Sequence, residues 1–189
     1  MSAAEAWGAS ERAPDVIGTL RVYRYLKLAP DGQLHSLAFE TVWRVKGPMT
    51  AECMRTTYPR WAGHTAPDKD CRCGFYAFYL PGVPSYIRGR YCAGSYWGNH
   101  VIAVAEASGT IIPNSLGVRA QKMTLLACAV ADSMYFRGGN SPGIPLFPTE
   151  EAMVREYPPR DDISGITGRT PEVMRDEWAE RHRKSPWMR

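Results

Sequence analysis

The sequence predicts an α+β fold: a β-rich body built of hairpins, one packed helix and a helical C-terminal extension. Segments rich in aromatic and β-branched residues, separated by Gly and Pro turns, fill most of the first half of the 189-residue chain. Segments with helix-forming residues and capping signals follow. The chain is 44% hydrophobic and 11% aromatic, which is enough apolar material for a core.

The first expected hairpin follows a flexible N-terminal segment at residues 1–15. Residues 16–29 and 34–45 are rich in Val, Leu and aromatic side chains, which favour strands. Residues 30–33 lie between them and contain Pro and Gly, which favour a tight turn. We therefore expect these two strands to pair.

Further strands are expected in the rest of the body, which spans residues 16–136. The candidates are residues 74–80, 86–96, 101–107 and 110–112. Ser108 and Gly109 separate the last two candidates, and this short interval predicts a hairpin turn.

Residues 118–134 are the helix candidate within the body. They contain Ala, Gln, Lys, Met and Leu, which favour helices. Apolar side chains recur at steps of three and four residues, as on one face of a helix. They are Ala120, Met123, Ala127, Val130 and Met134. We expect this helix to pack on the sheet with Cys128 in or near the core.

A Gly/Pro-rich linker at residues 137–148 is expected to join the body to a helical extension at residues 149–189. Thr149 is placed to cap a short helix at residues 150–157, and acidic residues follow it where the helix dipole favours them.

A final helix is expected from Thr170 to Lys184, because Thr, Pro and Glu open it and basic residues close it. Trp178 and Trp187 lie in this region and are candidate docking residues. They can dock on the body itself or on a partner protein.

Cysteine and histidine are concentrated in residues 50–74, which show neither helical nor strand periodicity. The spacing is Cys53-x10-His64-x6-Cys71-x-Cys73. Three thiolates and one imidazole are a common tetrahedral ligand set for zinc. Residues two apart in an extended chain point to the same face, so Cys71 and Cys73 can share one ion. The sequence predicts a loop stapled by a structural zinc ion, a contribution of roughly 10–16 kcal/mol in small sites.

Other interpretations of the cysteines remain open. They can be unrelated buried thiols, and Cys92 can replace Cys53 or His64 as a ligand. A disulfide is the third interpretation, but the odd count of five cysteines and the lack of a secretory signal argue against it. Four protein ligands would close the coordination shell, which indicates a structural ion. The zinc deaminase and H-E-x-x-H signatures do not occur in the sequence.

Two groups of basic residues are candidates for binding anions or nucleic acid. Arg119 and Lys122 stand at the start of the expected body helix, where free backbone N–H groups favour an anion. Arg88, Arg90 and Trp97 belong to a segment that interleaves cations with aromatic rings, as in single-strand binding surfaces. For both groups the alternative is an ordinary solvated or ion-paired surface.

Residues 16–130 resemble a group of short uncharacterised actinobacterial and actinobacteriophage proteins. The shared pattern is Trp43, Ala-x-Cys ending at Cys53, His-x-Ala-Pro from His64, and then Cys-x-Cys-Gly-x-Tyr-Ala. A valine-rich hairpin and Gly-x-Arg-Ala follow, with Val118 where those proteins carry an aromatic residue. The resemblance implies the metal, the fold and a phage or actinobacterial origin. It implies no activity, because none is established for the group.

The composition leaves several functions open. A net charge of +4 allows a nucleic-acid partner without requiring one. No apolar run approaches the roughly 18 residues of a membrane helix, and no secretory signal is present. We therefore expect no membrane partner and a cytoplasmic protein, located in the host cytoplasm or the virion if a phage encodes it.

The expected function is a non-enzymatic, zinc-stabilised binding or assembly module that acts through protein contacts. The alternatives are a nucleic-acid-binding regulator and a small zinc-dependent hydrolase. The sequence specifies neither the protein partner nor the oligomeric state.

Overall fold

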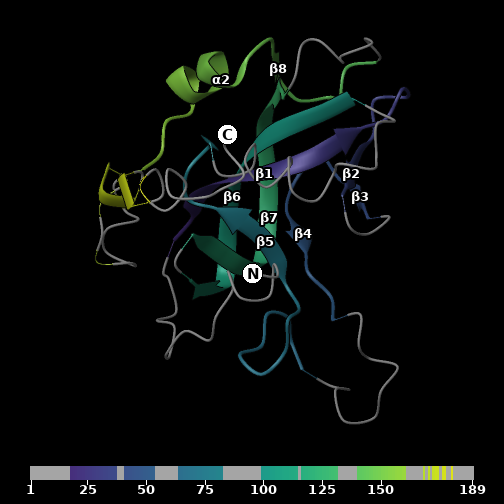
Figure 1. Cartoon of the computed structure of the whole chain (residues 1–189). Coiled ribbons are helices and arrows are strands. Elements are labelled where there is room, and N and C mark those ends of the chain that lie inside the picture. The colour runs from purple at the N-terminus through teal and green to yellow at the C-terminus, as the bar shows by residue number, and fades with distance from the viewer. Residues whose placement is uncertain are drawn as a thin grey trace.

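The computed structural model describes residues 18–37, 41–53, 64–82, 99–114, 116–131 and 140–160, with residues 168, 170, 172–174, 176, 177 and 180. Eight strands form one mostly antiparallel sheet (Figure 1). They are β1 (Leu20–Leu28), β2 (Leu34–Ser36), β3 (Val42–Trp43), β4 (Met49–Thr50), β5 (Phe75–Phe78), β6 (Asn99–Pro113), β7 (Gly117–Val130) and β8 (Leu146–Phe147); the helix α2 is Glu150–Glu156. The described part is a β-rich α+β fold, as predicted.

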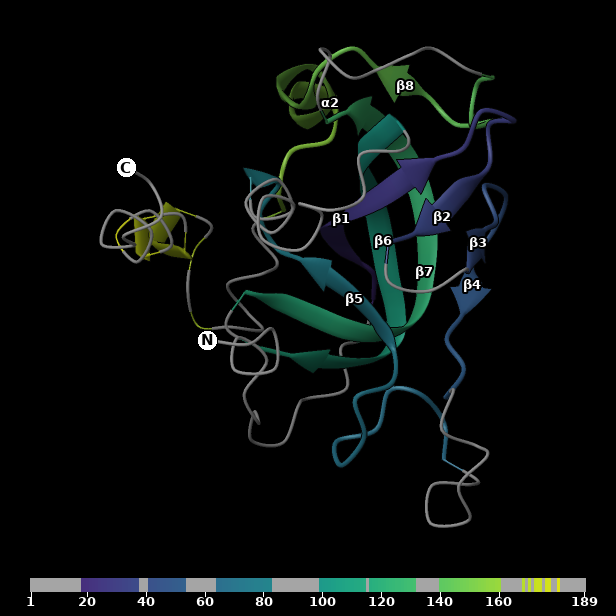
Figure 2. The same cartoon turned by 45° about the vertical axis from the view of Figure 1, so that its right-hand side comes forward.

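Four strands close into a ring. β1 pairs with β6, β6 with β7, and β7 with β5. β5 returns to β1 through the pair Tyr23 and Phe78. β2 and β3 extend the sheet from the far end of β1, and β4 and β8 add to β7 (Figure 2). Consequently the paired strands enclose a common interior.

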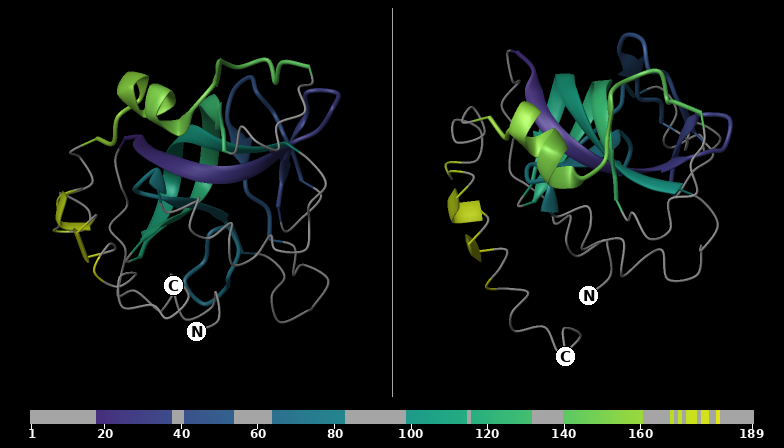
Figure 3. Two further views of the ribbon diagram at one scale, coloured as in Figure 1. Left: turned by 45° about the horizontal axis from the view of Figure 1, so that its top comes forward. Right: turned by 90° about the horizontal axis from the view of Figure 1, so that it is seen from above.

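Two apolar cores lie on opposite faces of these strands, because side chains alternate along a strand. Leu20, Val22 and Leu26 of β1 belong to the larger, inner core, whereas Tyr23 belongs to the smaller, outer one. Helix α2 covers the outer core and buries Met153 completely (Figure 3). Both faces of β6 and β7 are therefore covered near α2, which explains the continuous apolar runs at residues 101–105 and 125–130.

The prediction of a helix at residues 118–134 is wrong. Residues 118–130 belong to β7, which pairs with β6 along almost its whole length. Val104 pairs with Ala127 while Ala105 pairs with Leu125, so Leu126 is an extra residue that bulges from the ladder. A bulge in a strand buried on both faces produces apolar spacings of three residues, which imitate a helix.

The predicted turn at Ser108 and Gly109 is also wrong. β6 continues through these residues without reversing, and only its register with β7 shifts between Ser108 and Ile111. Gly109 has a φ of 73°, a conformation that favours glycine and suits a bulge. The glycine therefore marks an irregularity inside one long strand.

Other predicted elements are confirmed. The turn at residues 30–33 joins β1 to β2, and the Gln33 backbone N–H donates to Asp31 Oδ1 at 2.9 Å. The predicted strand at 34–45 occurs as the two short strands β2 and β3, and β5 lies within the strand predicted at 74–80. The strand predicted at 86–96 lies outside the described residues.

A half-buried cation, Arg24 of β1, lies beside the inner core. Its guanidinium lies over the Trp43 ring at 4.6 Å and donates to the Tyr76 carbonyl at 2.7 Å and to Ser36 Oγ at 3.3 Å. Burial lowers the pKa of Arg24 to about 10. Arg24 thus connects β1, β2, β3 and β5 near the junction of β5 with β1, where Tyr23 pairs with Phe78.

The C-terminal part contacts the body. Thr149 caps α2 as predicted, since its Oγ1 accepts from the Ala152 N–H at 3.2 Å. β8 lies inside the predicted linker and pairs with β7 in parallel. Farther along, Thr170 Oγ1 accepts from the Val173 N–H at 3.4 Å, and Met174 is buried in the inner core.

Trp178 and Trp187 lie outside the described residues. Within the described part of the chain, no helix has the length and apolar character required to cross a membrane.

The buried Tyr23 phenol should make the fold less stable at alkaline pH. Its hydroxyl donates to the Tyr157 carbonyl at 2.8 Å, and burial raises its pKa above the ordinary 10.0, although Arg21 lowers it. The folded state therefore retains the proton that the unfolded chain loses, so the contribution to stability is present below pH 10 and declines above it. Above pH 10 the wild type should lose stability more steeply than Tyr23→Phe, by up to about 1.4 kcal/mol per pH unit.

Urea denaturation from pH 8 to 11 measures this difference. Tyr157→Phe is the matched control, because it removes the phenol hydroxyl of the accepting residue but keeps the backbone carbonyl that accepts from Tyr23, so its slope should match the wild type. Equal slopes for the wild type and Tyr23→Phe would contradict the assignment.

Candidate metal centre

The segment that carries the Cys/His cluster is an insertion in a strand. β4 and β5 both pair with the same edge of β7, and they occupy consecutive positions on it. The Ala51 N–H donates to the Gln121 carbonyl at 2.7 Å, and Phe75 pairs with Ala120, the next residue of β7. The chain therefore leaves β7 after Ala51 and rejoins it at Phe75, and the described residues of the insertion 52–74, which are 52, 53 and 64–74, extend away from the ring (Figure 2).

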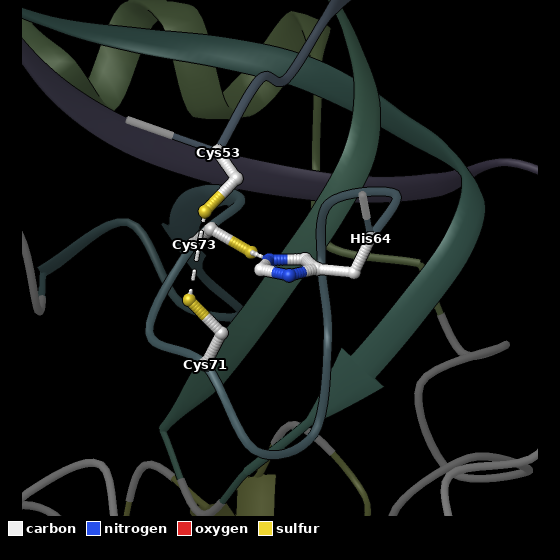
Figure 4. A group of neighbouring side chains, drawn as sticks. All are labelled: Cys53, His64, Cys71 and Cys73. Atoms are coloured by element: carbon white, nitrogen blue, oxygen red, sulfur yellow. Dashed lines mark hydrogen bonds between the residues drawn. The ribbon is translucent and has the colours of Figure 1, made fainter. Parts of the chain in front are cut away.

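The four predicted ligands converge at the neck of this insertion. The ligand atoms of Cys53, His64, Cys71 and Cys73 all lie within 4.8 Å of one another. Figure 4 shows their side chains directed toward a common point. Cys53 and Cys73 each lie two residues from a strand position on β7, so an ion bound here would tie the two ends of the insertion together.

The interatomic distances suit tetrahedral coordination. Cys53 Sγ and Cys71 Sγ are 3.7 Å apart, and His64 Nε2 and Cys73 Sγ are 3.3 Å apart. Around a tetrahedral zinc with bonds of about 2.3 Å to sulfur and about 2.0 Å to nitrogen, these separations would be about 3.8 Å and about 3.5 Å. Both separations are close to those of a tetrahedral site, and all four donor atoms lie near enough to one another to hold one metal ion.

The cysteines of the cluster carry thiols that are mostly shielded from water. No disulfide occurs among the described cysteines; Cys53 and Cys71 are buried, and Cys73 is half-buried. Burial raises the pKa of Cys73 to about 12; a backbone hydrogen bond from Asp68 lowers it, and the neighbouring thiols of Cys71 and Cys53 raise it. A bound divalent cation reverses this preference, because a coordinating thiol is deprotonated.

The backbone between His64 and β5 is folded tightly under the thiols. Asp68 Oδ1 accepts from the Asp70 N–H at 2.8 Å, and the Asp68 carbonyl accepts from the Cys71 N–H at 3.2 Å. Gly74 follows the last ligand with a φ of 112°, and a Cβ there would lie 2.9 Å from the Pro67 Cβ. Gly74 thus permits a tight turn after the second thiol of the pair.

The anion site predicted at Arg119 and Lys122 depended on a helix that starts at these residues. That helix does not occur. Both residues lie within β7. The Arg119 guanidinium contacts backbone carbonyls of the insertion, whereas Lys122 is exposed. Arg88, Arg90, Trp97 and Cys92 lie outside the described residues. Cys128 is fully buried in the inner core, as expected, but on a strand.

Sequence reasoning missed the role of Tyr76 and Arg119 in this region. They are directly paired across β5 and β7, and both hydrogen-bond to the insertion. The Gly-x-Arg-Ala motif contained Arg119, but only the strand pairing reveals which loop it faces.

The sequence matches no family model, and comparisons with curated proteins and with solved structures likewise gave no match.

Gly74→Ala should destabilise the insertion through both backbone strain and contact with Pro67. Gly47→Ala is the matched control, because Gly47 has a φ of 76° but nothing within 4 Å of the added Cβ. The left-handed conformation costs about 1–2 kcal/mol for an L residue at either position. In urea denaturation, we expect Gly74→Ala to lose about 1–3 kcal/mol more of its unfolding free energy than Gly47→Ala does, which is the usual range for overpacking. Equal losses for the two variants would contradict the tight packing of Gly74.

Proposed function

We propose that this protein is a non-enzymatic binding module whose insertion, residues 52–74, is ordered by one structural zinc ion. The convergence of Cys53, His64, Cys71 and Cys73 at the neck of the insertion carries the proposal. The β-rich ring and its two cores provide a rigid base. The ion gives the irregular loop a fixed shape on that base, as structural zinc does in other small sites.

The donor set favours zinc. Three thiolates and an imidazole are soft and borderline ligands, which select zinc over magnesium or calcium. The cluster contains no carboxylate ligand. Four-coordinate tetrahedral sites with three cysteines and one histidine are common structural zinc sites.

The same donor set argues against catalysis. A hydrolytic zinc ion has three protein ligands and a position open to water, whereas four protein atoms converge here. Nucleic-acid binding has no supporting contact among the described residues, because Arg119 is directed at backbone carbonyls. A protein-binding role is therefore our first hypothesis. The sequence resemblance to actinobacterial and actinobacteriophage proteins is the basis for proposing an accessory role in a phage or an actinobacterium.

The insertion presents a polar surface to a partner. Exposed polar side chains, among them acidic and basic ones, flank the cluster in the sequence. They are Glu52, Thr65, Lys69, Asp70 and Arg72. A loop that is polar outside and held by a metal inside pays less ordering entropy on binding than a flexible loop.

The purified protein should contain one zinc ion per chain. Cys71→Ser/Cys73→Ser should lose it, whereas Cys128→Ala, which alters a cysteine of the inner core, should retain it. Elemental analysis of the folded proteins measures the zinc, and cobalt substitution should give thiolate charge-transfer bands. A folded wild type without stoichiometric zinc would refute the site.

Zinc should also protect the insertion from proteolysis. Chelation should expose the bonds after Lys69 and Arg72 to trypsin, while the ring remains folded through its paired strands and cores. Mass spectrometry of limited digests identifies the cleaved bonds, and zinc should restore protection. Identical digestion with and without chelator, for protein shown to bind zinc, would contradict an ordering role.

Protein binding is tested separately by capture from host lysate with zinc-loaded wild type and with Cys73→Ser as bait. The proposal expects a partner whose recovery depends on zinc. Equal recovery with both baits would place the binding surface elsewhere.

A further inference from the structure

Arg119 reaches from β7 into the turn that carries Cys71 and Cys73. Its Nη1 donates to the carbonyls of Asp68, at 3.1 Å, and of Cys73, at 3.2 Å, and it also contacts the Cys71 carbonyl. One guanidinium nitrogen thus meets three carbonyls that surround the thiol pair. These contacts fix the backbone of two ligands without touching a sulfur.

Tyr76 completes this contact from the neighbouring strand. It pairs directly with Arg119 across β5 and β7, and its hydroxyl donates to the Arg72 carbonyl at 2.6 Å. Arg72 stands between Cys71 and Cys73, so the three consecutive carbonyls of residues 71–73 all contact one of these two side chains. Tyr76 is itself anchored, since its own carbonyl accepts from the half-buried Arg24.

The charge of Arg119 suits the proposed ion. A zinc ion with three thiolates and one neutral imidazole carries a net charge of −1. In the described part of the chain, the hydrogen bonds of Arg119 go to uncharged carbonyls, so no ion pair there neutralises it. A half-buried cation beside an anionic centre stabilises that centre more than an exposed cation does.

We propose that Arg119 is the positioning residue and counter-cation of the metal centre, and that Tyr76 assists it. The proposal rests on the zinc site proposed above and extends it to residues that are not ligands. Groups behind metal ligands fix ligand orientation, and their loss typically lowers metal affinity 10- to 100-fold. Arg119 acts on the cysteine backbone, so it sets the position from which both sulfurs approach the ion.

The test is zinc affinity, measured on the full chain by competition with a chromophoric chelator. Arg119→Met should weaken zinc binding by about 10- to 100-fold. Arg119→Lys keeps the charge but not the planar fork, so its affinity should be intermediate. Tyr76→Phe removes one hydroxyl and should have a smaller effect. Lys122→Met is the matched control, because Lys122 is an exposed cation of the same strand; it should bind zinc like the wild type.

Affinity separates this role from a purely structural one. If Arg119 only stabilised the ring, its loss would lower the stability of the apo and zinc-bound forms equally and leave affinity unchanged. Wild-type affinity in Arg119→Met, or an equal loss in Lys122→Met, would overturn the proposal. If Arg119→Met does not fold, unchanged affinity in both Arg119→Lys and Tyr76→Phe would overturn it. A wild type that binds no zinc would instead refute the site itself.

Discussion

The pairing of β7 on both of its edges is the constraint on which the rest of the structure depends. One edge pairs with β6, which in turn pairs with β1 and completes the ring. The other edge receives β4 and β5 in consecutive register, and this register brings the two ends of residues 52–74 together. Because β7 also carries Arg119, a single strand fixes the ring, the neck of the insertion and the backbone of two candidate ligands.

The ligand set could be predicted from the sequence because its signal is chemical. Three cysteines and a histidine in a segment without periodicity have few explanations, and the structure places their donor atoms together. The turn at residues 30–33 and the cap at Thr149 were predictable for a similar reason. Each depends on the conformational preferences of one or two residues and needs no knowledge of distant neighbours.

The strand β7 could not be recognised because its character arises from tertiary pairing. Its Ala, Met and Leu favour a helix when isolated, but β5 and β6 bind its backbone, and cores on both faces bury its side chains. The bulge at Leu126 then removes the strict alternation by which a strand is recognised. The role of Arg119 was hidden for the same reason, since its contacts lie about fifty positions away in the chain.

The consecutive pairing of Ala51 and Phe75 with neighbouring residues of β7 has a consequence for variation in this fold. The sheet is continuous across the point where the insertion departs, so the length and content of the excursion can change without disturbing the register of any strand. Long surface insertions of this kind cost little additional closure entropy. The ring can therefore accommodate a different excursion at this junction, provided that the new segment brings its two ends together.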